Sequence, residues 1–329
     1  MRLSICLSLG CATLLSTALP ASAQSQVSIS GLLDAGVFRS FDKTSELGTI
    51  QRSNLAIAGT EDLGGGLKAT FRLSTRFDLD TGLTEDFGKK PFWHDESTVG
   101  LQGGFGHVRI GRALSAMWSQ DWQFDPWANF NRISSPAWYQ WHYLTPTDRA
   151  SNNGFAEYGR MANGIFYDSP TVAGFTLHLS GSPERTEATG HQGRGYSASL
   201  NYDQGALAGM LAFERNGSGD KDTFVAGKYR FGAAAVMAAY DYSRTADGVS
   251  KARAATLGAT YQVGATTFKA GYGRQRLSGS GDQTNHFYSL GADYALSKRT
   301  TLYASLGRKS YERGADSGTA FGVGVSHAF

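Results

Sequence analysis

The chain has 329 residues and a nearly balanced charge, with 31 basic and 28 acidic side chains and a formal net charge of +3. That excess is too small to indicate a nucleic-acid-binding protein, and the length suits one or two domains. Glycine is 42 of the residues, against a typical share of about 7 %, while proline is only 7. Abundant glycine without a low-complexity tract favours many strands and tight turns over disorder.

The N-terminal segment predicts a secretory signal peptide over residues 1–23. Arg2 supplies a positive start, an apolar stretch runs from Leu3 to Leu19, and Ala21-Ser22-Ala23 matches a signal peptidase site. The alternative is a membrane anchor, but polar residues interrupt the apolar stretch, which is short for a spanning helix. Both cysteines lie in this segment, so the predicted mature chain, 24–329, contains none.

From Val27 to the end, apolar and polar side chains alternate with a period of two, which predicts β-strands with one apolar face. No later apolar run approaches the ~20 residues of a transmembrane helix. A membrane location therefore requires a closed barrel, in which every backbone group is paired. The alternative is a soluble sandwich, but its inward side chains would be large and apolar. Here they are small and polar in strand after strand.

Sixteen strands are expected, although fourteen or eighteen also fit the pattern. Short turns alternate with longer polar loops, as in outer-membrane barrels. Aromatic residues end the strands that lead into short turns, which is typical of a girdle at a bilayer interface. These residues are Tyr202, Tyr229, Tyr261, Tyr294 and the terminal Phe329. The expected strands start near residues 27, 52, 67, 96, 107, 161, 175, 194, 207, 223, 233, 252, 266, 285, 301 and 319.

The alternation stops between about residues 113 and 160. Because strands continue on both sides, a segment of this length predicts a functional loop. Its tryptophans allow two interpretations, packing of the loop against the barrel wall or a lining for sugars or aromatic solutes, and packing is the commoner role. The segment contains five of the six tryptophans, namely Trp118, Trp122, Trp127, Trp138 and Trp141.

Several segments resemble Gram-negative general porins of the β-proteobacterial type. They are 28–37 (SISGLLDAGV), 59–69 (GTEDLGGGLKA), 104–112 (GFGHVRIGR) and 163–170 (NGIFYDSP), together with the terminal Phe329. The second of these, a hairpin, is the most specific match. The resemblance covers essentially the whole predicted mature chain.

This resemblance implies an all-β, sixteen-stranded antiparallel transmembrane β-barrel in the Gram-negative outer membrane, most often a homotrimer. A third long loop would fold inward and narrow the pore, and the second, about 79–95, would reach a neighbouring subunit. The implied partners are outer-membrane lipids and lipopolysaccharide, with small anionic or neutral solutes and no nucleic acid. The segment 113–160 departs from the family by its length and tryptophan content, which leaves pore size and solute preference open.

Basic side chains are predicted to face the barrel interior. Lys68, Arg72 and Arg76 share the inward parity of one strand, and Arg109 has that parity two strands later. A cation facing lipid near mid-bilayer would cost roughly 2–4 kcal/mol, so these residues should face water and attract anions. They could also pair with acids of the inward loop, which would create a transverse field across the constriction. Those acids are Asp121, Asp125, Asp148 and Glu157.

Two further arginines, Arg39 and Arg132, align with pore arginines of some anion-preferring porins. Strict alternation, however, puts Arg39 on the outer face of its strand. The predicted pore-lining set is therefore Lys68, Arg72, Arg76, Arg109, Arg132, Asp121 and Asp125.

No catalytic residue, cofactor or metal site is predicted. The seven histidines show no H-x₃-H or H-E-x-x-H spacing, and neither a nucleophile elbow nor a P-loop occurs. Three hypotheses follow. The chain is a diffusion channel with a weak anion preference, a porin selective for an organic acid or sugar, or an outer-membrane lipase or protease. The last needs a Ser/His or Asp/His constellation that the sequence does not supply.

Overall fold

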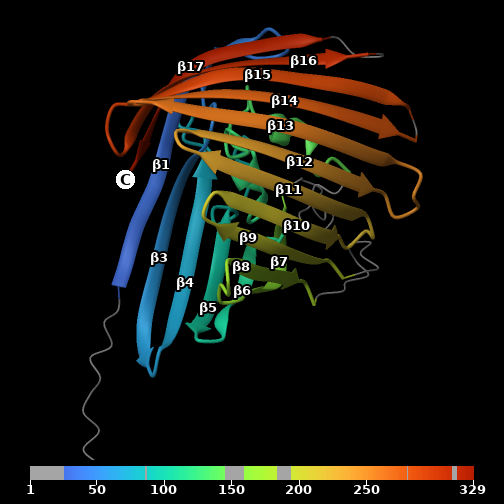
Figure 1. The fold of residues 1–329 in the computed structure, drawn as a ribbon. Coiled ribbons are helices and arrows are strands. Elements are labelled where there is room, and N and C mark those ends of the chain that lie inside the picture. Colours follow the sequence, from blue (N-terminus) through green and yellow to red (C-terminus); the bar gives the residue numbers. More distant parts are fainter. Residues whose placement is uncertain (1–25, 86, 145–158, 184–193, 280, 313–316) are drawn as a thin grey trace, which may run out of the picture.

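The computed structural model describes residues 26–329 except 86, 145–158, 184–193, 280 and 313–316. Within this part the chain forms one antiparallel sheet that closes into a barrel (Figure 1). β1 (Gln26–Arg39) closes it by pairing with β17 (Gly318–Ala328) on one side and with β3 (Ser53–Gly64) on the other. The predicted signal peptide lies outside the described residues and stays a prediction.

Seventeen strands are described, and sixteen of them form the wall, because β2 (Ser45–Gly48) is a short strand that pairs only with the last four residues of β1. The predicted sixteen-stranded barrel is confirmed, and the expected strand starts lie within two residues of the observed ones. Four residues are too few to show a period, so β2 was not expected. The other wall strands are β4 (Leu67–Phe77), β5 (Glu96–Gly103), β6 (Gly106–Leu114), β7 (Arg160–Asp168), β8 (Phe175–Gly181), β9 (Tyr196–Gln204), β10 (Leu207–Arg215), β11 (Lys221–Phe231), β12 (Ala234–Arg244), β13 (Lys251–Val263), β14 (Thr266–Ser278), β15 (Gln283–Ala295) and β16 (Thr300–Tyr311).

The outer face of the barrel is apolar. Val225, Leu257 and Leu290 are exposed there, while their chain neighbours, such as Phe224 and Thr256, point inward and are buried. Exposed aliphatic side chains around a closed sheet suit hydrocarbon, because closure leaves no backbone edge unpaired. The two-residue period therefore sorts side chains between lipid and the barrel interior.

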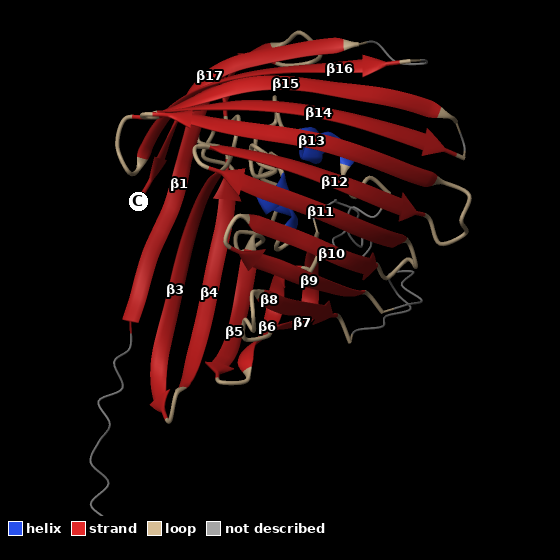
Figure 2. Ribbon diagram, in the orientation of Figure 1, coloured by secondary structure: helices blue, strands red, loops and turns tan. Residues whose placement is uncertain are grey.

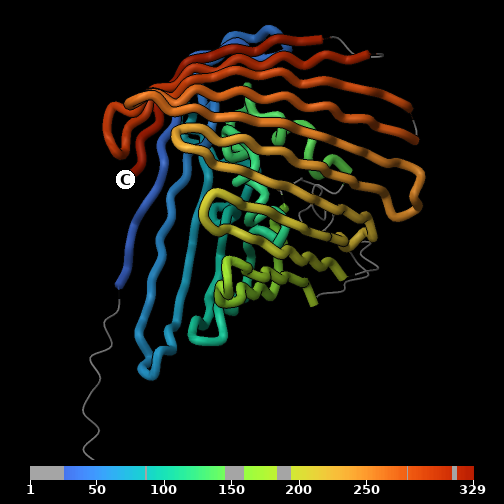
Figure 3. The backbone as a smooth tube through the Cα atoms, viewed as in Figure 1, coloured from blue at the N-terminus to red at the C-terminus, as the bar shows by residue number. Residues whose placement is uncertain are grey.

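The two rims of the barrel differ. Short turns gather at one rim and long connections at the other (Figure 3). At the short-turn rim, Tyr229, Tyr261 and Tyr294 are exposed on the outer face, as an interfacial aromatic girdle requires. In bacterial barrels the short turns are periplasmic and the long loops lie at the cell surface.

Two short helices, η1 (Asp121–Phe124) and α1 (Pro136–Gln140), lie inside the ring of strands (Figure 2). The hydroxyl of Ser135 accepts the backbone N–H of Trp138 and caps α1. The helix α1 packs against β13, β14 and β15, and η1 packs against β11 and β12. Neither helix is long and apolar enough to cross a membrane. The predicted inward-folded loop between β6 and β7 is confirmed.

Candidate functional site

The inward loop is held on the barrel wall by serines of neighbouring strands. The hydroxyls of Ser180 and Ser197 accept the backbone N–H groups of Ala116 and Met117, each at 3.0 Å. Ser199 donates to the carbonyl oxygen of Ala116, also at 3.0 Å. All three serines are buried. Small polar inward residues were expected to line a water-filled lumen. In this region they instead bind the backbone of the inward loop.

A second anchor lies on β16. Asn131 donates from Nδ2 to the hydroxyl of Ser305 at 2.9 Å, and its Oδ1 accepts the N–H groups of Ile133 and Ser134. Beside it, a Cβ added to Gly307 would lie 1.9 Å from the carbonyl oxygen of Ile133. Glycine in the wall therefore allows the loop backbone to touch the strand directly.

Two of the tryptophans pack against the wall. Trp127 and Trp141 are buried, and the indole N–H of Trp141 donates to the hydroxyl of Thr256 at 3.2 Å. The ring of Trp141 also meets Phe224 edge-on, with 4.8 Å between centroids. Trp122, by contrast, is 42 % exposed. The packing interpretation is confirmed for Trp127 and Trp141.

The wall cations of β4 and β6 pair with carboxylates of neighbouring strands. Glu96 lies 3.1 Å from Arg72 and 2.9 Å from Arg109, measured between nitrogen and oxygen. Arg109 also reaches Asp168 at 3.1 Å. Lys68, nearer the short turns, is exposed and forms no ion pair with another described residue. Carboxylates of the wall strands therefore neutralise part of the positive charge of the wall cations.

A second ionic cluster joins the long connection 78–95 to the inward loop. Asp95 lies 2.7 Å from Nε of Arg76 and also pairs with Arg160. Glu85 lies 3.6 Å from Arg132 of the inward loop and 3.9 Å from Arg76. These contacts tie two loops to the wall from within one chain.

The charge state of Glu85 follows from these neighbours. Burial alone would raise the pKa of Glu85, but the approach of His94 and the charges of Arg76, Arg132 and Arg160 hold that pKa at about 2. The carboxylate is therefore ionised across the neutral range, and it balances part of the arginine charge at this level of the barrel.

Comparison with known proteins agrees with this architecture. A family model for Gram-negative porins matches residues 10–314. The chain belongs to the Gram-negative porin family. The porin is 29 % identical to outer membrane porin protein 32 of Delftia acidovorans over 352 residues, covering 94 % of this chain and 95 % of that relative.

Solved structures share the fold of the porin. An anion-selective porin from Comamonas acidovorans is 26 % identical, with a TM-score of 0.78 that covers 93 % of this chain and 100 % of the other. OmpT of Vibrio cholerae, solved in a trimer form, has a TM-score of 0.69 at 14 % identity, covering 93 % and 99 %. The porin is therefore an outer-membrane channel protein and not an enzyme.

The residues predicted to line the pore of the porin fall into two groups. The accessible or partly accessible ones are Lys68, Arg72, Arg109 and Arg132. The buried ones are Arg76, Asp121 and Asp125. Arg39 belongs to neither group. It is the exposed last residue of β1 with the outward parity of Val37, as the alternation predicts, so the alignment with pore arginines does not hold for Arg39.

The predicted pairing of wall cations with loop acids is wrong for Asp121 and Asp125. Asp125 accepts the backbone N–H groups of Trp127 and Asn129 at 2.9 and 3.0 Å, and burial raises its pKa to about 6. Asp121 contacts His142 instead of an arginine. The other two loop acids, Asp148 and Glu157, lie outside the described residues.

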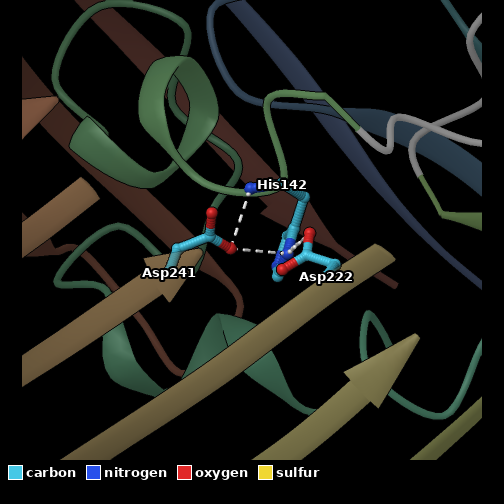
Figure 4. Close-up of side chains that lie close together, drawn as sticks. All are labelled: His142, Asp222 and Asp241. Atoms are coloured by element: carbon cyan, nitrogen blue, oxygen red, sulfur yellow. Dashed lines mark hydrogen bonds and ion pairs between the residues drawn. The ribbon is translucent and has the colours of Figure 1, made fainter. Parts of the chain in front are cut away.

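His142 joins the inward loop to β11 and β12 through a buried ionic cluster (Figure 4). Its Nδ1 lies 2.9 Å from Oδ2 of Asp222 and 2.9 Å from Oδ2 of Asp241, and its Nε2 lies 3.2 Å from Asp121. The backbone N–H of His142 also donates to Asp241 at 3.0 Å. Burial alone would lower the pKa of His142, but Asp222, Asp241 and Asp121 hold it well above its usual value.

The side-chain donor atoms of His142, Asp222 and Asp241 lie within 4.8 Å of one another, which is also a spacing at which a metal ion could be held. Both ring nitrogens, however, already contact carboxylates, as an imidazolium requires. The partners are 80 and 99 residues away in the chain, so no spacing motif could reveal them. The one sequence signal was an aspartate at an inward position on each strand.

Proposed function

We propose that the porin passes small hydrophilic solutes by passive diffusion, prefers anions, and works as a homotrimer. The observation that carries the anion preference is the accessibility of two interior cations. The side chain of Arg72 is 41 % exposed against 18 % for Glu96, and that of Arg132 is 35 % exposed against 14 % for Glu85. A passing ion therefore meets the guanidinium groups more readily than their carboxylates.

The balance of charge on this side of the interior supports the same proposal. On the wall, three cations face two carboxylates, namely Lys68, Arg72 and Arg109 against Glu96 and Asp168. Around the loops, four arginines face three carboxylates, namely Arg52, Arg76, Arg132 and Arg160 against Asp78, Glu85 and Asp95. An unbalanced positive charge inside a low-dielectric wall concentrates anions.

A third cation near the loop lacks a carboxylate partner among the described residues. Nζ of Lys309 lies 3.4 Å from the ring centroid of Tyr139 and 4.2 Å from that of Phe41. The aromatic faces attract the ammonium group without cancelling its charge. Of the two solved porins with this fold, one is anion-selective and the other was solved in a trimer form, which supports the proposed preference and assembly.

A selective porin for an organic acid or sugar is the second candidate function. The observation that favours it is Trp122, which is exposed on the inward loop while Trp127 and Trp141 are buried. An exposed indole could stack on a sugar ring. Saturable block of the ionic current by a sugar, lost in Trp122→Ala, would support this candidate.

Reversal potentials in planar bilayers under a potassium chloride gradient test the anion preference. The wild-type channel is expected to be anion-selective, and Arg72→Gln with Arg132→Gln should shift the reversal potential toward the cation side. A charge at about 8 Å in water contributes about 0.5 kcal/mol, so each substitution should change the anion-to-cation permeability ratio several-fold. The control is Arg39→Gln, which removes one arginine from the outer face. A cation-selective wild-type channel would overturn the anion preference, and the absence of any conductance would overturn the channel.

A further inference from the structure

A buried histidine and two buried aspartates meet where the inward loop touches β11 and β12 (Figure 4). Nδ1 of His142 lies 2.9 Å from Oδ2 of Asp222 and 2.9 Å from Oδ2 of Asp241. All three side chains are fully buried. The histidine belongs to the loop and the aspartates to two paired strands, so this contact joins the loop to the wall.

A single proton on Nδ1 of His142 cannot satisfy both aspartates. Each nitrogen of an imidazolium carries one hydrogen, and a hydrogen bond weakens steeply when that hydrogen points away from the acceptor. Because the two carboxylate oxygens lie at the same distance from Nδ1, the hydrogen points at one of them or is shared poorly between both. A divalent cation at this point would bind both carboxylates at once.

Asp241 has an acceptor that the described residues do not use. Its Oδ2 accepts the backbone N–H of His142 at 3.0 Å, but its Oδ1 is buried and has no hydrogen-bond partner within the described part of the chain. No described lysine or arginine forms an ion pair with Asp241. Buried carboxylates in proteins are paired or bind metal ions, because an unsatisfied charge in the interior is costly. The free oxygen of Asp241 therefore points to a cation as the missing partner.

The second ring nitrogen of His142 has the kind of partner that metal-binding histidines use. Nε2 lies 3.2 Å from Oδ2 of Asp121 in η1. A histidine that binds a metal through one nitrogen almost always donates its other N–H to a carboxylate, a carbonyl or water, which fixes the ring and makes the ligand more basic. Nε2–H can donate to Asp121 in this way, which leaves Nδ1 as the metal ligand.

The donor atoms favour zinc among the common divalent ions. One imidazole nitrogen with carboxylate oxygens suits zinc, whereas calcium and magnesium take six or more ligands that are nearly all oxygens. Tetrahedral zinc holds nitrogen and oxygen donors at about 2.0–2.2 Å, which spaces the donors about 3.3 Å apart. From the observed 2.9 Å, each carboxylate of Asp222 and Asp241 would move back by about 0.4 Å. Oδ1 of Asp241 or a water molecule would complete the coordination.

Aromatic rings enclose these ligands. The ring centroid of His142 lies 4.5 Å from that of Trp118, 5.3 Å from that of Phe224 and 6.4 Å from that of Trp141. An apolar shell keeps water away and strengthens the attraction between a cation and its carboxylates. The two tryptophans also place fluorescent side chains beside the ligands.

We propose that His142, Asp222 and Asp241 bind one zinc ion, which holds the inward loop on β11 and β12. Zinc takes the place of the hydrogen on Nδ1, while Nε2 keeps its hydrogen and donates to Asp121. The imidazolium described above is the metal-free form. Because the ligands come from three segments that meet only in the closed barrel, zinc binds the folded chain and stabilises it. The proposal depends neither on the ion preference of the channel nor on its assembly.

Refolding of the untagged porin from denaturant into detergent micelles, with and without zinc chloride, tests the proposal. Mildly alkaline pH is used, where fewer protons compete for Nδ1. After removal of free metal, elemental analysis should find one zinc per chain in the wild type and none in His142→Gln. Asp121→Asn should still bind zinc, but with roughly 10–100-fold lower affinity, because it removes only the partner of Nε2.

The matched control is His178→Gln. His178 is also an interior histidine, but it contacts a single carboxylate, Asp168, at 2.7 Å, so this variant should bind zinc like the wild type. Cobalt in place of zinc should give the visible absorption of tetrahedral coordination and quench the fluorescence of Trp118 and Trp141. Both signals should be absent in His142→Gln. Zinc should also raise the unfolding midpoint of the wild type and leave that of His142→Gln unchanged.

Three results would overturn the proposal. They are the absence of zinc from the refolded wild type, equal zinc content in the wild type and His142→Gln, and loss of zinc from His178→Gln to the same extent as from His142→Gln. A wild-type circular dichroism spectrum shows that a variant is folded. If His142→Gln does not refold, Asp121→Asn decides the question, and an unchanged zinc affinity of that variant would also overturn the proposal.

Discussion

Replacing Gly307 by alanine should displace the inward loop. A Cβ at this position would lie 1.9 Å from the carbonyl oxygen of Ile133 and 3.0 Å from its carbonyl carbon, and both atoms belong to the loop backbone. Carbon and oxygen ordinarily approach no closer than about 3.3 Å, so the loop or β16 must move by more than about 1 Å. Overpacking of this kind costs about 1–3 kcal/mol.

The matched control is Gly227→Ala on β11, where the nearest atom to an added Cβ is 4.0 Å away. Gly307→Ala should lower the denaturant midpoint and change the single-channel conductance, because Ile133 adjoins Arg132 and the ionic cluster of Glu85. Gly227→Ala should leave the conductance unchanged. If both variants showed wild-type conductance and stability, the loop would not be seated on β16 as described.

Three further perturbations test the anchors of the inward loop. Trp141→Ala should lower stability by about 3–5 kcal/mol in denaturant titrations, and the exposed Trp122→Ala much less; equal losses would contradict the packing role. Because the pKa of His142 is raised above its usual 6.5, its stabilisation is complete below pH 6.5 and is lost as the pH rises through the folded value. Proteolysis of the loop should therefore increase at alkaline pH, and His142→Gln should abolish that dependence. The pKa of Glu85 moves from 4.5 to about 2, worth about 3 kcal/mol, so its stabilisation is present above pH 4.5 and lost toward pH 2. Glu85→Gln should flatten this acid limb in pH-dependent unfolding, and an unchanged acid limb would assign it to other groups.

The alternation of apolar and polar residues along the chain was enough to predict the barrel. Side-chain direction in a strand depends on residue parity alone, so alternation located sixteen strands within two residues of their starts and placed Arg72 and Arg109 in the interior. The same parity set Arg39 on the outer face, against the alignment with pore arginines. The break in alternation also located the inward loop, because a chain without the strand period cannot continue the wall.

The partners of the charged residues were decided only by the closed barrel. Whether a carboxylate faces a cation, a backbone N–H or an imidazolium depends on which strands and loops meet, and those contacts join residues far apart in the chain. Asp121 and Asp125 have ordinary loop sequences around them, yet one reaches His142 and the other caps its own turn. The sequence shows that the inward side chains are small and polar. Such residues can either hydrogen-bond to the inward loop or line a water-filled pore, and the sequence does not distinguish these two roles. Only the path of the loop across the wall distinguishes the two.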